Sequence, residues 1–207
     1  MQVESNISLE QQILEAAEEL FLDKGFAMTS TTEIAKKAGC NQALIHYYFR
    51  TKENLFLKLF ESKFIQFASS INPVVFEGLK FEDKLKAIID SHISMIERNP
   101  KIPFLLLNEV TINSERFGKI IEEIKTLIIP LIMNLSAELI KEERAGTIRK
   151  VDPFHLLFSI ISMDVFMFIA RPLVQLIREF DDDEYETFIE ERKAQIFDLV
   201  WNSIKVQ

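Results

Sequence analysis

Residues 13–56 read ILEAAEELFLDKGFAMTSTTEIAKKAGCNQALIHYYFRTKENLF, and this stretch decides the fold of the N-terminal part of the chain. Ser30 and Glu33 have the spacing of a capping box, in which each residue satisfies the other's backbone at a helix start. That helix is short because residues 38–39, Ala-Gly, end it, and Asn41 can cap another short helix directly afterwards. Two short helices joined by a glycine-containing turn indicate a helix-turn-helix motif, although they could equally be filler in a helical bundle.

The predicted motif lies in the basic part of an acidic chain. From Lys24 to Lys63 there are seven basic and three acidic residues, so this stretch carries a net charge of +4. The whole chain carries −8, which leaves −12 on the other 167 residues. A locally basic surface on an acidic protein favours contact with nucleic acid through one selected face.

The composition argues against several other classes of protein. The chain has 207 residues, of which 48% are hydrophobic, so it can bury a sizeable core. Five glycines and six prolines are too few for the many turns of a β-sandwich or barrel. One cysteine and three histidines leave too few ligands for a Cys/His zinc site, so no metal or cofactor is expected. No basic and apolar leader is visible in the first residues, so a cytoplasmic protein is expected.

The remaining sequence predicts longer helices and no strand. Pro130 is expected to bend one of these helices and Pro172 to kink another. Asp183 and Glu186 have capping-box spacing at the start of the last helix. With the four N-terminal segments, these helices give an all-α fold of about nine helices. The longer predicted helices span residues 82–98, 103–111, 114–145, 153–170 and 183–204.

The most apolar segment covers residues 154–170. A membrane-spanning helix needs about 20 predominantly apolar residues. This segment is shorter, contains Asp164, and is closed by Arg171 and Pro172. An aspartate at the centre of a membrane costs about 2.5–3.5 kcal/mol, so burial inside the protein or between subunits is expected instead.

Residues 13–56 closely resemble the DNA-binding domain of the TetR-type (TetR/AcrR-like) transcriptional regulators. The positions that match the family pattern are Ala17, Leu20, Phe21, Gly25, Phe26, Thr31, Ile34, Ala35, Ala38, Gly39, Tyr47, Phe49, Lys52, Glu53 and Leu55. The sequence departs from the pattern at His46, where tyrosine is most common, and at Tyr48, where histidine is common. The resemblance implies a helix-turn-helix DNA-binding domain over residues 1–52, with 53–70 as a connecting helix. It also implies a ligand-binding and dimerisation domain over 71–207.

The resemblance further implies which side chains contact DNA. Gln42, Ala43 and Leu44 would enter the major groove, with Gln42 as the residue that reads a base. Thr31 and Thr32 would meet phosphate or the groove edge at the start of the second helix. The residues expected to hold the DNA backbone are His46, Tyr47, Tyr48 and Lys52.

The region after residue 71 carries no comparable motif, so its sites are predicted from residue types. Phenylalanine and methionine at helical spacing are usually ordinary core, and the alternative is an apolar pocket with a few polar anchors. Asp164 is the most suggestive anchor, because an acid in an apolar helix needs a partner or water. The predicted pocket residues are His92, Phe104, Asn108, Phe117, Phe158, Asp164 and Met167. The apolar faces of the last two helices would pair with a second subunit, or else be buried within the chain.

The predicted function is that of a DNA-binding transcriptional regulator and not of an enzyme. We expect a repressor that binds a palindromic operator as a homodimer and is released by a small apolar or amphipathic ligand. Two alternatives remain, a helical-bundle enzyme such as a carboxylate di-metal oxidase and a dimeric adaptor that acts without DNA. Di-metal chemistry uses Glu-x-x-His pairs. His155 alone has an acid three residues before it, and that acid, Asp152, is better explained as a helix cap.

Overall fold

The computed structural model describes residues 8–72, 77–112 and 114–206, and in α6 and α7 it omits the side chains of residues 109–110, 112, 114–117, 119–121 and 123. These ranges contain ten helices: α1 (Leu9–Met28), α2 (Thr31–Lys37), α3 (Gln42–Phe49), α4 (Lys52–Ser70), α5 (Phe81–Arg98), α6 (Ile102–Ile112), α7 (Ser114–Ala145), α8 (Pro153–Ile169), α9 (Arg171–Arg178) and α10 (Asp182–Ile204). Apart from one isolated bridge between Ile148 and Lys205, no strand pairing occurs in the described residues. The all-α prediction is therefore confirmed.

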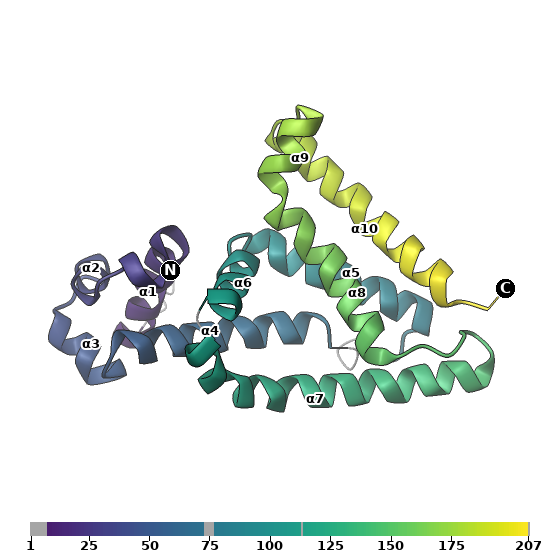
Figure 1. The fold of residues 1–207 in the computed structure, drawn as a ribbon, viewed down its shortest axis with the longest axis horizontal. Helices are drawn as coiled ribbons and strands as arrows, with labels where there is room; N and C mark the ends of the chain where they lie inside the picture. The colour runs from purple at the N-terminus through teal and green to yellow at the C-terminus, as the bar shows by residue number, and fades with distance from the viewer. Residues whose placement is uncertain (1–7, 73–76, 113, 207) are drawn as a thin grey trace, which may run out of the picture.

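The first three helices and the start of α4 share one hydrophobic core at one end of the molecule (Figure 1). Phe21 of α1, Ile34 of α2 and Ile45 of α3 are fully or almost fully buried in it. Leu105 of α6 and Ile124 of α7 belong to the same cluster. The helix-turn-helix end therefore packs directly on helices from the other part of the chain.

A second core lies among α5, α7, α8 and α10. α8 and α10 pack against each other and are joined at their upper ends by α9 in Figure 1. α4 runs from the helix-turn-helix end to this second core, where Phe67 packs against it. One continuous helix thus touches both cores.

The predicted helix starts are confirmed where the capping residue is local and unambiguous. Ser30 and Glu33 form a complete capping box at the start of α2. The Asn41 side chain accepts from the Leu44 backbone N–H at 3.1 Å, which caps α3. The Thr51 hydroxyl accepts from the Asn54 N–H at the start of α4 in the same way. Each cap satisfies a backbone donor that the first helical turn leaves open.

The region of α8 and α9 differs from the prediction of one helix with a kink at Pro172. α8 ends at Ile169 and α9 begins at Arg171, and the two axes are bent by 65° across Ala170. Proline in the first turn of a helix lacks only an N–H that would be unsatisfied there, so Pro172 begins a new helix. The helix count is therefore ten in the described residues.

No single described helix is long and apolar enough to cross a membrane, and α8 with α9 meets that test only as a bent pair.

The last helix begins earlier than predicted. Asp181 and Glu184 form its capping box, instead of Asp183 and Glu186. Both pairs have the same spacing, so the local pattern cannot choose between them. Tyr185 in the first turn of α10 is buried, and its hydroxyl donates to the Met167 carbonyl at 2.6 Å. This long-range contact joins the first turn of α10 to α8.

Candidate nucleic-acid interface

α3 has one buried face and one exposed face. Ile45 and Phe49 are buried against α2 and α4, while the Tyr47 side chain is 69% exposed. Two further predicted contacts, Gln42 and Ala43, are exposed near the start of the helix, and Leu44 is half-buried. The structure thus presents on one short helix the side chains that the sequence predicted for the major groove and, except for Lys52 in α4, for the DNA backbone.

The Gln42 side chain bridges the beginnings of α2 and α3. Its Nε2 donates to Thr31 Oγ1 at 2.8 Å, and Thr32 Oγ1 donates to its Oε1 at 3.3 Å. The three predicted contacts therefore form one hydrogen-bonded group. A carboxamide has two N–H donors and an oxygen with two lone pairs, so this group leaves capacity for a base edge. The bonds to threonine hold the amide in a fixed orientation before DNA is present.

The aromatic residues of α3 are also arranged by local contacts. The Tyr47 and Tyr48 rings meet edge to face with centroids 5.1 Å apart. His46 Nδ1 lies 2.9 Å from the Arg50 carbonyl oxygen. Because a carbonyl can only accept, Nδ1 carries the proton and donates in this contact. His46 Nε2 is then the nitrogen that remains to meet a partner outside the chain.

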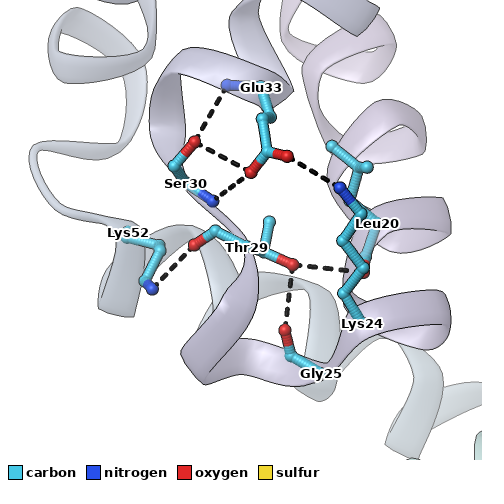
Figure 2. A network of polar contacts seen from close by, with 7 residues as sticks. All are labelled: Leu20, Lys24, Gly25, Thr29, Ser30, Glu33 and Lys52. Atoms are coloured by element: carbon cyan, nitrogen blue, oxygen red, sulfur yellow. Dashed lines mark hydrogen bonds and ion pairs between the residues drawn. The ribbon is translucent and has the colours of Figure 1, made fainter.

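Lys52, which was predicted to contact phosphate, donates hydrogen bonds within the chain (Figure 2). Its Nζ donates to the Phe26 carbonyl at 2.9 Å and to the Thr29 carbonyl at 2.8 Å, and it lies 4.2 Å from the centroid of the Phe26 ring. The physical reason is the non-helical Gly25 (φ 74°) inside α1, because such a break leaves carbonyl groups near the helix end without helical donors. The Lys52 ammonium supplies donors to that region from the first turn of α4.

The connection between α1 and α2 is fixed by a second set of polar contacts in Figure 2. The buried Thr29 hydroxyl is 2.9 Å from the Gly25 carbonyl, to which it donates. Next to it, Glu33 accepts from the Ser30 N–H and from Lys24 Nζ at 2.7 Å. The hydrogen bond from Lys24, followed by those from Ser30, lowers the pKa of Glu33 to about 2. These contacts set where α2 starts relative to α1 and α4.

The positive charge of this region is partly neutralised by acids from α1. Lys37 pairs with Glu19 at 2.5 Å, and Lys63 pairs with Glu18 at 2.6 Å. The Lys37–Glu19 pair is exposed, and exposed ion pairs contribute about 0–1 kcal/mol, so Lys37 can exchange its carboxylate for a phosphate at small cost. Arg50, which the sequence did not single out as a contact, is exposed between α3 and α4 and has φ 66°. The positive charge of Arg50 could be read from the sequence, but its left-handed backbone conformation could not.

Two family models match this chain and together cover most of it. The model described as bacterial regulatory proteins, tetR family, matches residues 13–59, which include all of α2 and α3. The model described as tetracyclin repressor-like, C-terminal domain, matches residues 82–200. The chain belongs to the TetR family.

Three similar proteins illustrate the relationship. The fatty acid metabolism regulator protein of Bacillus subtilis is 32% identical over 85 residues, which are 41% of this chain and 44% of that protein. The transcriptional regulator QacR of Staphylococcus aureus is 42% identical over 53 residues, 26% of this chain and 28% of QacR. The chain thus matches less than half the length of these two relatives. A TetR-family regulator from Shewanella sp. PV-4 has the same fold, with a TM-score of 0.66 and 22% identity over 97% of this chain and 100% of that one.

TetR-family membership makes this protein a DNA-binding transcriptional regulator. It confirms the prediction of a regulator and does not support the enzyme alternative, because the relatives and structural neighbours are regulators. Among the described residues, no group of three or more histidine, cysteine, aspartate and glutamate side chains could hold a metal ion.

The structure does not gather all the predicted ligand-pocket residues of this TetR-family chain. His92 and Asp164 meet in the core, and Met167, three residues after Asp164 in α8, is buried in the second core. Phe104 and Phe158 are 64% and 62% exposed instead of lining an enclosed site, because they lie on outward faces of α6 and α8. Asn108 is partly buried, and the Phe117 side chain lies outside the described part of the chain.

Two surface pockets lie elsewhere in the C-terminal part of the chain. One of about 410 Å³ is lined by Phe168, Arg171 and Tyr185 among others. The other, of about 640 Å³, lies between α4 and α5, beside Gln66 and Ser91. Neither pocket is lined by any of the seven residues predicted from the sequence.

Proposed function

We propose that this TetR-family chain is a repressor that binds a palindromic operator as a homodimer and is released by a small apolar or amphipathic ligand. The observation that carries the proposal is the exposed face of α3, whose Gln42 is held in place by Thr31 and Thr32. A side chain with a fixed carboxamide is suited to reading a base edge, because little rotamer entropy is lost on binding. We propose Tyr47 and His46 as contacts to the DNA backbone on either side of that reading position.

The homodimer is supported by an apolar surface on α8. Phe154, Phe158 and Phe166 are all more than half exposed, and the first two rings stack with centroids 6.1 Å apart. Three exposed phenylalanines on one helix are costly in water, so a second copy of the chain is proposed to cover them, together with the adjacent α10. A two-fold dimer repeats the same contacts on both subunits, which gives an operator of two inverted half-sites.

Release by a ligand requires that the two parts of the chain are coupled. We propose a division into a DNA-binding domain over residues 1–52, a connecting helix over 53–70 and a ligand-binding and dimerisation domain over 71–207. α4 supports this coupling because it holds the α1–α2 connection through Lys52 and packs on the second core through Phe67. An apolar effector is supported by the hydrophobic character of the C-terminal core and by the name of the Bacillus subtilis relative, a fatty acid metabolism regulator. We also propose a cytoplasmic location, because a repressor acts on chromosomal DNA.

The test is selection of bound sequences from a pool of random duplex DNA, followed by mobility-shift titration of the enriched sequence. We expect an inverted repeat whose half-site centres lie about one helical turn, 10–10.5 base pairs, or a multiple of it apart. Failure to bind any duplex at low salt would favour the adaptor alternative. Enrichment of a single half-site without an inverted partner would contradict the homodimer.

A further inference from the structure

One polar pair lies inside the apolar C-terminal core. His92 of α5 and Asp164 of α8 are both 0% exposed, and His92 Nδ1 lies 2.7 Å from Asp164 Oδ2. The Phe67 ring of α4 meets the His92 ring edge to face at 4.5 Å. Three helices therefore converge on the pair, and one of them is the helix that reaches the DNA-binding part.

Each side chain of the pair retains one polar atom without a partner. His92 Nε2 and Asp164 Oδ1 are buried and have no hydrogen-bond partner among the described residues. A buried polar atom that lacks a partner costs about 1–3 kcal/mol. Two such atoms on contacting side chains are therefore available to a polar group from outside the described residues.

The hydrogen-bonding pattern of these two atoms follows from the net charge of the pair. Burial raises the pKa of Asp164, and the other charges acting on it, Arg192 and Asp90, have opposite signs. A net charge in such a site is costly, so the pair is expected to remain neutral overall. If His92 is protonated and Asp164 ionised, Nε2 donates and Oδ1 accepts. If the proton lies on Asp164 Oδ2 instead, Nδ1 accepts it, and again Nε2 carries a proton while Oδ1 accepts.

We propose that His92 and Asp164 form the polar anchor of the effector site, and that they select an uncharged ligand whose head group both accepts and donates a hydrogen bond. An aliphatic alcohol or a primary amide has this pattern, with an acceptor for Nε2–H and a donor for Oδ1. A carboxylate offers acceptors only and would face the Asp164 oxygen, while an ammonium offers donors only. This inference rests on the proposed ligand-released function and names the chemical class of its ligand.

The surroundings of the anchor suit an apolar ligand body. Ile93 and Met167, which lie close to His92 and Asp164 along α5 and α8, are buried in the second core, and the Phe67 ring packs against this core and against the His92 ring. A ligand that enters here displaces side chains next to Phe67 and so acts on α4 directly. The residues that select the ligand head group are therefore also the residues through which the ligand acts on α4 and the DNA-binding part.

The experiment measures direct binding of four eight-carbon probes by calorimetry at about pH 7.5, without DNA. The probes are 1-octanol, octanamide, octanoate and octylammonium, which share the same chain and differ in their head groups. We expect octanol and octanamide to bind about ten- to hundredfold more tightly than the two ions. Tighter binding of octanoate or octylammonium, or equal binding of all four, would overturn the proposal.

A double variant, His92→Phe with Asp164→Leu, tests whether the pair is responsible. Replacing both partners by apolar groups of similar shape can be nearly neutral for folding, whereas a single replacement leaves the other group unpaired. We expect the double variant to unfold at a similar temperature and to bind octanol and the two ions with no more than a few-fold preference. The control is Asp83→Leu, an exposed carboxylate in the first turn of α5, which should keep the wild-type preference. Retention of the full octanol preference in the double variant would overturn the proposal.

Failure of this inference is distinguishable from failure of the proposed function. Mobility-shift titration of the operator with and without octanol reports on release separately from binding. If octanol binds as expected but leaves operator affinity unchanged, the anchor stands and ligand release is wrong. If no probe binds while the selected operator still does, the DNA-binding function stands and the anchor is wrong.

Discussion

Gln42 is the residue at which sequence-specific recognition is most directly testable. Its amide is held by Thr31 and Thr32, so the same group of atoms serves both the internal bonds and the proposed contact to a base. Gln42→Ala should relax base preference at one position of each half-site by about 1–3 kcal/mol. Thr31→Val should give a smaller loss at that same position, because it frees the amide of Gln42 without removing it. Competition binding across single-base operator variants measures both. A loss that is equal for all sequences would show that Gln42 does not read a base.

Substitution of Lys52 can distinguish a role in positioning the α1–α2 connection from a contact to a DNA phosphate. Because its Nζ donates to the Phe26 and Thr29 carbonyls, Lys52→Met should lower the free energy of unfolding by about 1.5–3 kcal/mol. Affinity for DNA should fall equally for all sequences, with the salt dependence unchanged. A lost phosphate contact would instead lower the salt slope by about 0.9 in each half-site. Lys58→Met, on the exposed side of the same helix, serves as the control for loss of one charge. A reduced slope for Lys52→Met alone would support the phosphate contact predicted from the family resemblance and contradict a purely positioning role.

Glu33 gives a prediction on acid stability. Its pKa is lowered from 4.5 to about 2, first by the hydrogen bond from Lys24 and then by those from Ser30. A carboxyl group with a depressed pKa in the folded state stabilises that state above the unfolded value, and the contribution is lost as the pH falls through the folded value. The free energy of unfolding should therefore fall between about pH 4.5 and 2, and Glu33→Gln should flatten this part of the profile. Denaturant titration at several pH values measures it, with Glu143→Gln, at an exposed position of α7, as the control. An unchanged profile in Glu33→Gln would contradict the assignment.

At the scale of elements, α8 combines a buried face with an exposed apolar face. Ile160 and Asp164 face the core, while Phe158 is 62% exposed. Phe158→Arg should leave the fold of the single chain intact and dissociate the dimer, because a charge then enters the proposed interface. Sedimentation at micromolar concentration should show a monomer, and the unfolding temperature should no longer rise with protein concentration. Met133→Arg, at a similarly exposed apolar position on α7, should remain dimeric. A dimeric Phe158→Arg variant would place the interface elsewhere.

At the scale of the whole molecule, two helix-turn-helix units must reach two half-sites on one side of the DNA. Inserting about five base pairs between the half-sites turns one of them by half a helical turn, away from its reading helix. Affinity should then fall to that of a single half-site, and inserting about ten base pairs should restore part of it. Mobility-shift titration of the three duplexes checks this. Equal affinity for all three would mean that each subunit binds DNA independently.

The sequence by itself determined the elements, most of their boundaries and the family. Capping residues such as Ser30 and Asn41 act on backbone groups within three residues, so their effect is visible in the sequence and was confirmed. The periodicity of apolar residues is equally local, and it predicted the buried and exposed faces of α3. The residues proposed to contact DNA followed from the resemblance over 13–56, because they lie close together in the chain as well as in space.

Tertiary structure alone decided what depends on contacts between distant residues. His92 and Asp164 are 72 positions apart, and nothing in either neighbourhood shows that their side chains meet. The direction of the Lys52 ammonium depends on the Phe26 and Thr29 carbonyls, 26 and 23 positions earlier, near the break in α1. Two overlapping capping patterns at the start of α10 were locally equivalent, and the observed first turn carries a buried Tyr185 bonded to the Met167 carbonyl. In each case the deciding energy is a hydrogen bond or burial that exists only after helices from separate parts of the chain have packed.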